Sequence, residues 1–467
     1  MINFKRFIGT RAFYRTLLAV MIPILIQNGI TNFINLLDNV MVGQVGTEQM
    51  SGVSIVNQLI FVFNLCIFGA ISGAGIFGAQ FFGKGDHEGV RNTFRFKFYL
   101  AAVLFALAML VFLLFGEDLI GLYLHEGSET GDLALTMQSA KDYLAVLLIG
   151  LLPFTVTQLY ASTLREIGHT VPPMAAGIAG VLVNLSLNYV LIFGKLGLPA
   201  LGVVGAATAT VISRFVECAV VIIWTHRHAD RCQFIKGAYH SFYVPAPLAK
   251  KILVTGTPLL LNECLWSIGQ ALLLQCYSVR GIAVVSAMNI TNTLFNTFSV
   301  LFIAVGSAIA ILIGHRLGAG ECEQARDDAR KMIAFSTVMG LICGVLVLAL
   351  APIFPRLYNT TDEVRALAVS FTIVVASVAP MHGYLHACYF TMRSGGKTLI
   401  TFLFDSGYVW CINLSLAFVL SRYSSLSPTW VYLICQLSDA LKLVMGTVLI
   451  AHGTWANDMT QMKGERT

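Results

Sequence analysis

The chain has 467 residues, of which 57% are hydrophobic and only 12% are charged, and its mean hydropathy is +0.76. A soluble domain carries about 25% charged residues, so this composition excludes a water-soluble globular protein of this size. The formal net charge is +6, but the basic residues gather in the polar loops and give no support to nucleic-acid binding.

Twelve stretches are long and apolar enough to cross a bilayer, which takes about 20 residues of helix. In chain order they are 14–40, 51–80, 98–116, 135–163, 171–194, 200–225, 252–279, 284–314, 332–355, 364–391, 399–420 and 428–452. No small-residue cleavage site follows the first stretch, so we interpret it as a helix and not as a signal peptide. The pattern predicts an all-α integral membrane protein with twelve transmembrane helices.

The second half of the chain repeats the first at an offset of 235 residues. Residues that recur include Pro23 and Pro258, Asn57 and Asn292, Gly83 and Gly318, and Arg91 and Arg326. Six helices per half is an even number, so the halves are predicted to be parallel repeats with the same orientation. We expect an N-terminal lobe at 1–225, a cytoplasmic linker at 226–251 and a C-terminal lobe at 252–467.

The distribution of lysine and arginine predicts the orientation. The face that would carry both termini holds 22 of the 30 basic residues, and the opposite face holds six. The loop after the third stretch agrees, because it has no basic residue and five acids: Glu117, Asp118, Glu126, Glu129 and Asp132. Both termini are therefore predicted to lie in the cytoplasm, with the protein in the plasma (inner) membrane.

Two glycine patterns are predicted to serve the packing of helices. Gly73-x-Gly75-x-x-Gly78 matches the dinucleotide-binding fingerprint, but it lies in an apolar helix with no strand before it, so close helix packing is the better interpretation. Phe82-Gly-Lys-Gly-Asp86 and Leu317-Gly-Ala-Gly-Glu321 should end helices with glycines at positive φ. The arginines after them are expected to hold structural loops, with gating contacts as the alternative.

Three acidic residues inside the predicted spans are candidates for function. They are Asp38, Glu263 and Asp405. A charge at bilayer depth costs about 2.5–3.5 kcal/mol on insertion scales, so each side chain should face the bundle interior or a wet cavity. Such a carboxylate can carry a proton or bind a cation. A structural ion pair is the alternative for each of them.

Two further pairs of charges are predicted to be structural. Arg214 and Glu217 lie three residues apart in the sixth stretch, and Asp439 and Lys442 have the same spacing in the twelfth. Residues at i and i+3 share a helix face, so each pair can neutralise itself. Asn184 and Asn188, one turn apart in the fifth stretch, either bridge helices or line a polar cavity beside Asp38.

The ordered set of motifs resembles the multidrug and toxic compound extrusion (MATE) family of secondary transporters. The likeness is carried by Asp38-Asn-Val-Met-Val-Gly43, Arg165-x-x-Gly168-x-Thr170, Asn184-Leu-Ser-Leu-Asn188, Gly256-Thr-Pro258 with Glu263, and Met392-Arg-Ser-Gly-Gly-Lys-Thr398. The resemblance implies two six-helix bundles that alternate between inward and outward openings. It also implies export of organic, often cationic, amphipathic compounds by antiport with H⁺ or Na⁺.

The resemblance also implies roles for individual residues. The coupling proton or sodium ion would bind at Asp38, with Asn184 and Asn188 beside it. Many relatives have aspartate at the second of these positions. The second lobe offers Glu263, and His382 and His386 stand where other branches carry an acid. Each of these histidines could belong to the core or to a proton path.

No cofactor is expected other than the coupling ion, and the predicted partners are a small-molecule substrate and membrane lipid, with the chain acting as a monomer. The principal alternative is a lipid-linked saccharide flippase, which would call for extra helices and a basic cavity. A membrane-embedded enzyme would need a polar catalytic cluster, and a passive channel would conduct without movement of a counter-ion. The sequence offers no P-loop, H-E-x-x-H or G-x-S-x-G motif.

Overall fold

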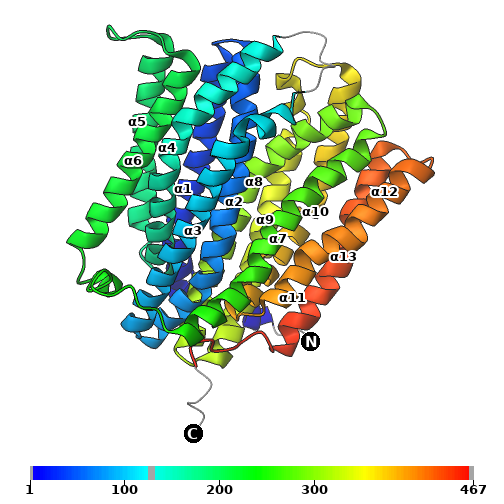
Figure 1. Ribbon diagram of the computed structural model, residues 1–467. Coiled ribbons are helices and arrows are strands. Elements are labelled where there is room, and N and C mark those ends of the chain that lie inside the picture. Colours follow the sequence, from blue (N-terminus) through cyan, green and yellow to red (C-terminus); the bar gives the residue numbers. More distant parts are fainter. Residues whose placement is uncertain (1–3, 125–131, 462–467) are drawn as a thin grey trace. The chain divides into compact units, whose positions relative to one another are not determined.

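The computed structural model describes residues 4–124 and 132–461, and in this part of the chain the regular elements are all helices (Figure 1). The helices of the first half are η1 (Phe4–Phe7), α1 (Arg11–Gly43), α2 (Thr47–Lys84), α3 (His87–Gly121), α4 (Leu133–Glu166), α5 (Val171–Phe193) and α6 (Gly202–Arg227). The short η2 (Gln233–Ile235) lies in the predicted linker. Glu126 and Glu129 of the acidic loop lie outside the described residues.

The second half repeats this order. Its helices are α7 (Ala246–Ser278), α8 (Ile282–Gly318), α9 (Cys322–Leu350), η3 (Phe354–Leu357), α10 (Asp362–Ser394), α11 (Thr398–Phe402), η4 (Leu403–Gly407), η5 (Val409–Asn413), α12 (Leu414–Tyr423) and α13 (Pro428–His452). Twelve helical segments of the described chain are long and apolar enough to cross a membrane, when Thr398–Tyr423 is counted as one. The predicted fold class and number of spans are confirmed.

The chain forms two compact units, whose limits differ from the lobes expected from the sequence. Unit 1 comprises the described parts of 1–25, 79–86 and 250–467, and unit 2 comprises 26–78 and the described parts of 87–249. Helices α1 and α2 each contribute residues to both units. The boundary at 226–251 stays a prediction.

Unit 2 is built around α4, which packs against α3 and α6, while α5 packs against α6. Its core includes Ile67, Ile120, Leu147 and Leu151, all of which are almost fully buried. In a bilayer such side chains stabilise the packing of helices through van der Waals contacts and not through removal from water. This packing fixes α5 and α6, on which the polar residues of the unit lie.

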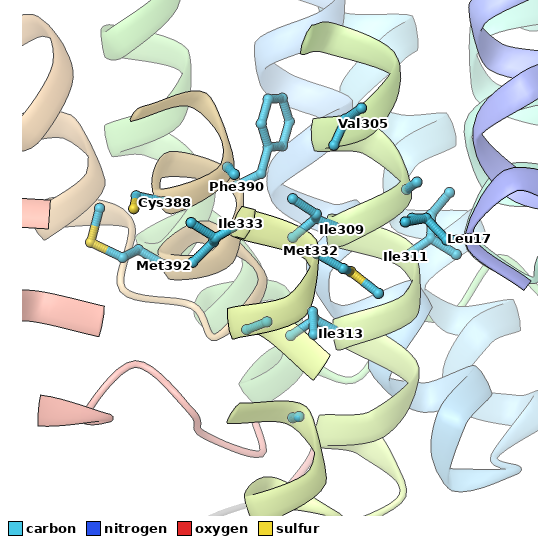
Figure 2. Packing of buried hydrophobic residues seen from close by; sticks show 14 of the residues in the cluster. Leu17, Val305, Ile309, Ile311, Ile313, Met332, Ile333, Cys388, Phe390 and Met392 are labelled. Carbon is cyan, nitrogen blue, oxygen red and sulfur yellow. The ribbon is translucent and has the colours of Figure 1, made fainter. Parts of the chain in front are cut away.

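Unit 1 has α10 at its centre, in contact with α8, α9 and α13. Figure 2 shows part of its core, in which Leu17 of α1, Ile309 and Ile313 of α8, Met332 of α9 and Cys388 of α10 pack together. These side chains are all at most 2% exposed. The first part of α1 is therefore built into the same core as the second half of the chain.

The end of α2 crosses α8 at symmetry-related glycines. A Cβ at Gly83 would collide with the carbonyl oxygen of His315, and a Cβ at Gly318 would collide with that of Gln80. His315 and Gly318 are the repeat counterparts of Gln80 and Gly83 at the same offset of 235. Only glycine permits so close an approach of two backbones, which explains these members of the two loop motifs. The next glycines, Gly85 and Gly320, have φ of +78° and +79°, as predicted for helix ends.

Helices α3 and α9 begin at His87 and Cys322, about three helical turns before the apolar stretches that predicted them. The added turns contain charged residues, and an arginine in each of them donates to a backbone carbonyl. Arg91 Nε lies 3.3 Å from the oxygen of Phe234, and Arg326 Nη2 lies 3.0 Å from that of Gly453. These repeat-related arginines each hold the segment that follows the sixth span of their own half. The structural interpretation of these arginines is supported.

Both of these segments are anchored by buried side chains. In the linker, Cys232 and Phe234 are fully or almost fully buried, and burial raises the pKa of the Cys232 thiol to about 11. In the C-terminal segment, Trp455 is 2% exposed. The buried amide of Gln80 donates to the oxygen of Ser394 at 2.9 Å and accepts from Met459 N at 2.6 Å. Residues 453–461 are thereby fixed to the end of α2 within unit 1.

Candidate functional site

A chain of hydrogen bonds joins the polar side chains of α1, α5 and α6 in unit 2. Asn188 Nδ2 lies 2.5 Å from Asp38 Oδ1 and 3.0 Å from Asn184 Oδ1. Asn184 Nδ2 in turn lies 3.3 Å from Thr210 Oγ1. The structure therefore brings Asp38, Asn184 and Asn188 together, and it adds Thr210 of α6, which the sequence analysis did not single out. The asparagines bridge helices, and Asn188 contacts Asp38 directly, whereas a polar cavity beside Asp38 stays a prediction.

The charge of Asp38 has no cationic partner in the described part of unit 2. Among the described residues, no lysine, arginine or histidine nitrogen lies within 4.0 Å of its carboxylate. Asn188 is fully buried, and its Oδ1 has no hydrogen-bond partner in the described chain. An unpartnered buried carbonyl is costly, by about 1–3 kcal/mol. The carboxylate and this amide oxygen are the ligand types that hard cations prefer.

In unit 1 the principal polar cluster surrounds Asp405. Its Oδ1 lies 2.9 Å from Lys442 Nζ of α13, and its Oδ2 lies 3.1 Å from Asn262 Nδ2 of α7. The Lys442 ammonium also lies over two rings, at 5.1 Å from the centroid of Phe404 and 5.9 Å from that of Tyr408. Asp405 thus has a built-in cation, unlike Asp38.

Asn262 also accounts for the irregular helix that carries Asp405. The residues Leu403–Gly407 and Val409–Asn413 are π-helical. Ser406 N donates to Asn262 Oδ1 at 3.2 Å, and Ser406 Oγ donates to the same oxygen at 2.8 Å. The side chain of Asn262 therefore occupies the opening in the helical hydrogen-bond pattern, as is common at functional sites. Neither Asn262 nor the π-helix was identified from the sequence.

Glu263 follows Asn262 on α7 and is half-buried, and it has no hydrogen bond or ion pair with another described residue. The two histidines of α10 lie against phenylalanine rings of α8. His382 packs edge-on to Phe295 at 5.4 Å between centroids, and His386 lies 5.9 Å from Phe302. His386 Nδ1 is 3.2 Å from the carbonyl oxygen of His382. A role for Glu263 or His382 in coupling stays a prediction.

The two expected ion pairs within single helices are not formed. Lys442 pairs with Asp405, and Asp439 instead accepts from Asn413 Nδ2 at 3.2 Å. Arg214 Nη1 donates to the carbonyl oxygen of Gly150 at 3.4 Å, and its guanidinium lies 5.1 Å from the ring of Phe154. No ion pair within 4.0 Å joins Arg214 to Glu217 in the described chain. Helical spacing permits such pairs, but neighbouring helices supply the partners here.

The MatE family profile matches residues 23–190 and 258–419. These two ranges cover well over half of the chain. The chain belongs to the MatE family. Proteins of this family are transporters and not enzymes, so this chain is an integral membrane transporter.

Related proteins cover nearly the whole length of this MatE chain. The probable multidrug resistance protein NorM of Halalkalibacterium halodurans is 27% identical over 438 residues, which is 90% of this chain and 91% of that protein. The multidrug resistance protein MdtK of Pectobacterium atrosepticum is 27% identical over 366 residues, 78% of each chain.

Solved structures share the fold. A multidrug resistance MATE family transporter in an outward-facing conformation has a TM-score of 0.84 at 18% identity, with 97% of this chain and 99% of that chain covered. A mutant of the Vibrio cholerae MATE transporter VcmN also has a TM-score of 0.84, at 16% identity, with 95% and 98% covered.

The family match includes most of the candidate residues but not all of them. Asp38, Asn184 and Asn188 fall in the first matched range, and Glu263, His382 and Asp405 fall in the second. Lys442 and Asp439 lie beyond the second range. Arg214 and Glu217 lie between the two ranges. The cation that neutralises Asp405 therefore comes from a helix outside the matched segments.

One buried ion pair of this MatE protein was missed in the sequence. Lys97 of α3 and Glu166 of α4 lie 2.5 Å apart with side chains 0% and 10% exposed. Lys97 Nζ also lies 3.2 Å from Thr163 Oγ1. A Cβ at Gly75 would lie 2.7 Å from Glu166 Oε1, and a Cβ at Gly78 would be closer still to Oε2. The dinucleotide-like glycines thus leave room for a carboxylate, in agreement with their predicted role in packing.

Proposed function

We propose that this protein exports organic compounds, preferentially cationic and amphipathic ones, by antiport with H⁺ or Na⁺ that binds at Asp38. The observation that carries the proposal is the lack of partners for polar groups of Asp38 and Asn188 in the described part of unit 2. Among residues 4–124 and 132–461, the half-buried carboxylate of Asp38 has no cationic partner, and the oxygen of the fully buried Asn188 amide beside it has no hydrogen-bond donor. A cation at this point would satisfy both groups.

Either coupling ion fits this chemistry. A proton would neutralise the Asp38 carboxylate in place, and a sodium ion would take that carboxylate and the Asn188 carbonyl as ligands. Ion binding moves the equilibrium between two openings of the transporter only if the ion binds one opening more tightly. Substrate that prefers the other opening is then exchanged for the ion. The names of the relatives, multidrug resistance proteins, support a broad range of substrates.

The proposal includes the cellular setting. The excess of basic residues in the loops on the side of the termini supports a cytoplasmic location of both ends of the chain. The protein works as a monomer in the plasma membrane, with lipid around its apolar helices. Cysteine residues placed near each end and labelled from outside intact cells would test the orientation, and labelling of either end without permeabilisation would contradict it.

The deciding experiment measures ethidium movement in proteoliposomes of the purified protein, first under an imposed proton gradient and then under a sodium gradient. Movement driven by one ion and abolished by Asp38→Asn supports the proposal and names the ion. Asp230→Asn is the matched control, because it makes the same chemical change at a linker side chain that is 94% exposed. An Asp38→Asn protein that still concentrates ethidium against its gradient would rule out coupling at Asp38.

A further inference from the structure

The surroundings of Lys442 have the composition of a binding site for an organic cation. Its ammonium lies 2.9 Å from a carboxylate oxygen of Asp405 and over the rings of Phe404 and Tyr408. A carboxylate flanked by aromatic faces is the usual receptor for alkylated ammonium groups. In this protein the receptor is filled by one of its own side chains.

The pair is accessible and not sealed in the core. The side chains of Asp405 and Lys442 are 22% and 11% exposed, whereas that of Lys97 in the other membrane pair is fully buried. Both residues lie within spans, Lys442 ten residues before the end of α13, which corresponds to about 15 Å of helix. Charged side chains at such depth face the interior or a water-filled cavity. A ligand in that space could reach them.

A second carboxylate gives Lys442 an alternative partner. Asp439 lies one turn earlier on the same helix, and its carboxylate accepts a hydrogen bond from the amide of Asn413. Residues at this spacing can pair along a helix face. The side chain of lysine is a flexible stem with a point charge, so it can change partners without movement of the backbone.

The local charge leaves room for one more cation. Asp405 and Asp439 are two carboxylates, and Lys442 is the one ammonium that pairs with either of them in the described chain. With both acids ionised the group carries one net negative charge. If a ligand cation takes Asp405 while Lys442 moves to Asp439, every charge is paired and the cluster becomes neutral.

We propose that Lys442 is a tethered surrogate for substrate, which occupies an organic-cation site formed by Asp405, Phe404 and Tyr408 and moves to Asp439 when a lipophilic monocation binds. This inference rests on the proposed export of organic cations and names one residue that sets the affinity for them. Lys442 acts as a built-in competitor that neutralises the charge of the Asp405 carboxylate in the absence of substrate. The substrate class is a monocation with an exposed alkylammonium or a delocalised aromatic charge.

Binding of tetraphenylphosphonium to the purified full-length protein tests the exchange. Lys442→Met removes the competitor and should tighten binding by about tenfold, in line with a cation–π and carboxylate site that is vacated. Asp439→Asn removes the alternative partner and should weaken binding by a similar factor. Unchanged affinity in both variants would overturn the proposal.

The double variant Asp405→Asn/Lys442→Met protects the test against misfolding of Lys442→Met, since it removes the anion and the cation of the pair together. If the pair is only structural, this variant should bind tetraphenylphosphonium as well as the unmodified protein does. If Asp405 is the ligand carboxylate, the double variant should bind about tenfold more weakly. Equal affinity of the double variant and the unmodified protein would contradict the proposal.

A small probe tests occupancy of the lysine position itself. Propylammonium corresponds to the part of the lysine side chain that Lys442→Ala removes, and it should raise the melting temperature of that variant but not of the unmodified protein. Propanol, which lacks the charge, should have no such effect. An equal shift in Lys442→Ala and Asp405→Asn/Lys442→Ala would overturn the assignment of Asp405.

These measurements separate this inference from the proposed function. Failure of the unmodified protein to move ethidium under either ion gradient would count against export, whatever the binding data show. Ion-driven ethidium movement together with unchanged tetraphenylphosphonium affinity in Lys442→Met, Asp439→Asn and the double variant would leave export in place and reject only the role of Lys442.

Discussion

The carboxylates of the two units differ in what neutralises them. Within the described part of the chain, Asp38 of unit 2 has an amide donor but no cation, and the adjoining oxygen of Asn188 has no donor. Asp405 of unit 1 has an ammonium at 2.9 Å and an amide at 3.1 Å. The charge of Asp38 would be neutralised by a proton or metal ion from solution, whereas the charge of Asp405 is already neutralised by Lys442. Asp38 and Asp405 are not counterparts in the repeat, since Asp38 corresponds to Leu273 at the offset of 235, so the two units differ in where their charge lies as well as in what neutralises it.

The largest expected effect is the loss of ion coupling on neutralisation of Asp38. Asp38→Asn should abolish ethidium accumulation driven by an ion gradient, because no titratable or anionic group remains at the unpaired site. Asp405→Asn/Lys442→Met should retain ion-driven movement, at higher ethidium concentrations, since it removes a pair that is internally neutral. Transport in proteoliposomes under each gradient measures both. Loss of coupling in the double variant and its survival in Asp38→Asn would reverse the comparison.

How far the sequence predicts this contrast depends on the kind of contact. The spans and the repeat follow from apolar runs and an offset, and the proximity of Asn184 and Asn188 follows from helical spacing. The partner of Lys442 does not, because Asp439 at i−3 and Asp405 on another helix are equally compatible with the pattern. Hydrogen bonds between helices depend on rotation and depth, which composition does not encode. Asn262 was missed for that reason, since its function is to fill a gap in a distant helix.

Gly75 and Gly78 also show that a sequence pattern does not identify the group that makes a contact. Their spacing predicts that another helix packs closely against α2 at these positions. The approaching group is the carboxylate of Glu166, which is paired with Lys97. A sequence pattern can show that space is needed without showing that a charge fills it.

The Lys97–Glu166 pair provides a structural reference for the comparison. Removal of one partner of a buried ion pair costs about 3–5 kcal/mol, so Lys97→Met and Glu166→Gln should each destabilise the protein strongly. Lys97→Met/Glu166→Leu should recover most of that loss, because the two charges of the pair are removed together. Melting temperatures in detergent measure the effect. If Lys442→Met costs as much stability as Lys97→Met, the more exposed pair at Asp405 is structural as well.

A smaller effect is expected for Asn262, which fixes Asp405 and the π-helix. Asn262→Ala leaves Ser406 N and one oxygen of Asp405 without their partner, at a cost of about 1–3 kcal/mol in unfolding free energy. Asn289→Ala on exposed helix surface is the control and should stay within about 0.5 kcal/mol of the unmodified protein. Equal stability of the two variants would show that the π-helix does not depend on Asn262.

The smallest predicted change tests whether ion affinity at Asp38 also depends on the hydrogen bond between Asn184 and Thr210. Thr210→Val removes the hydroxyl that accepts from Asn184, and a hydrogen bond of this kind contributes about 0.5–1.5 kcal/mol. The amide of Asn184 would then hold Asn188 less firmly, so the coupling ion should bind about 2- to 10-fold more weakly. Thr208→Val is a matched control on the same helix, because its hydroxyl bonds only to the carbonyl of Val204 at 2.8 Å. The ion concentration that gives half-maximal ethidium transport distinguishes the two variants. A shift shared by both variants would assign the effect to α6 as a whole. A shift confined to Thr210→Val would show that ion binding at Asp38 depends on a hydrogen-bond chain that runs through Asn188 and Asn184 to a third helix. Asp405 does not need such a chain, because Lys442 already pairs with it.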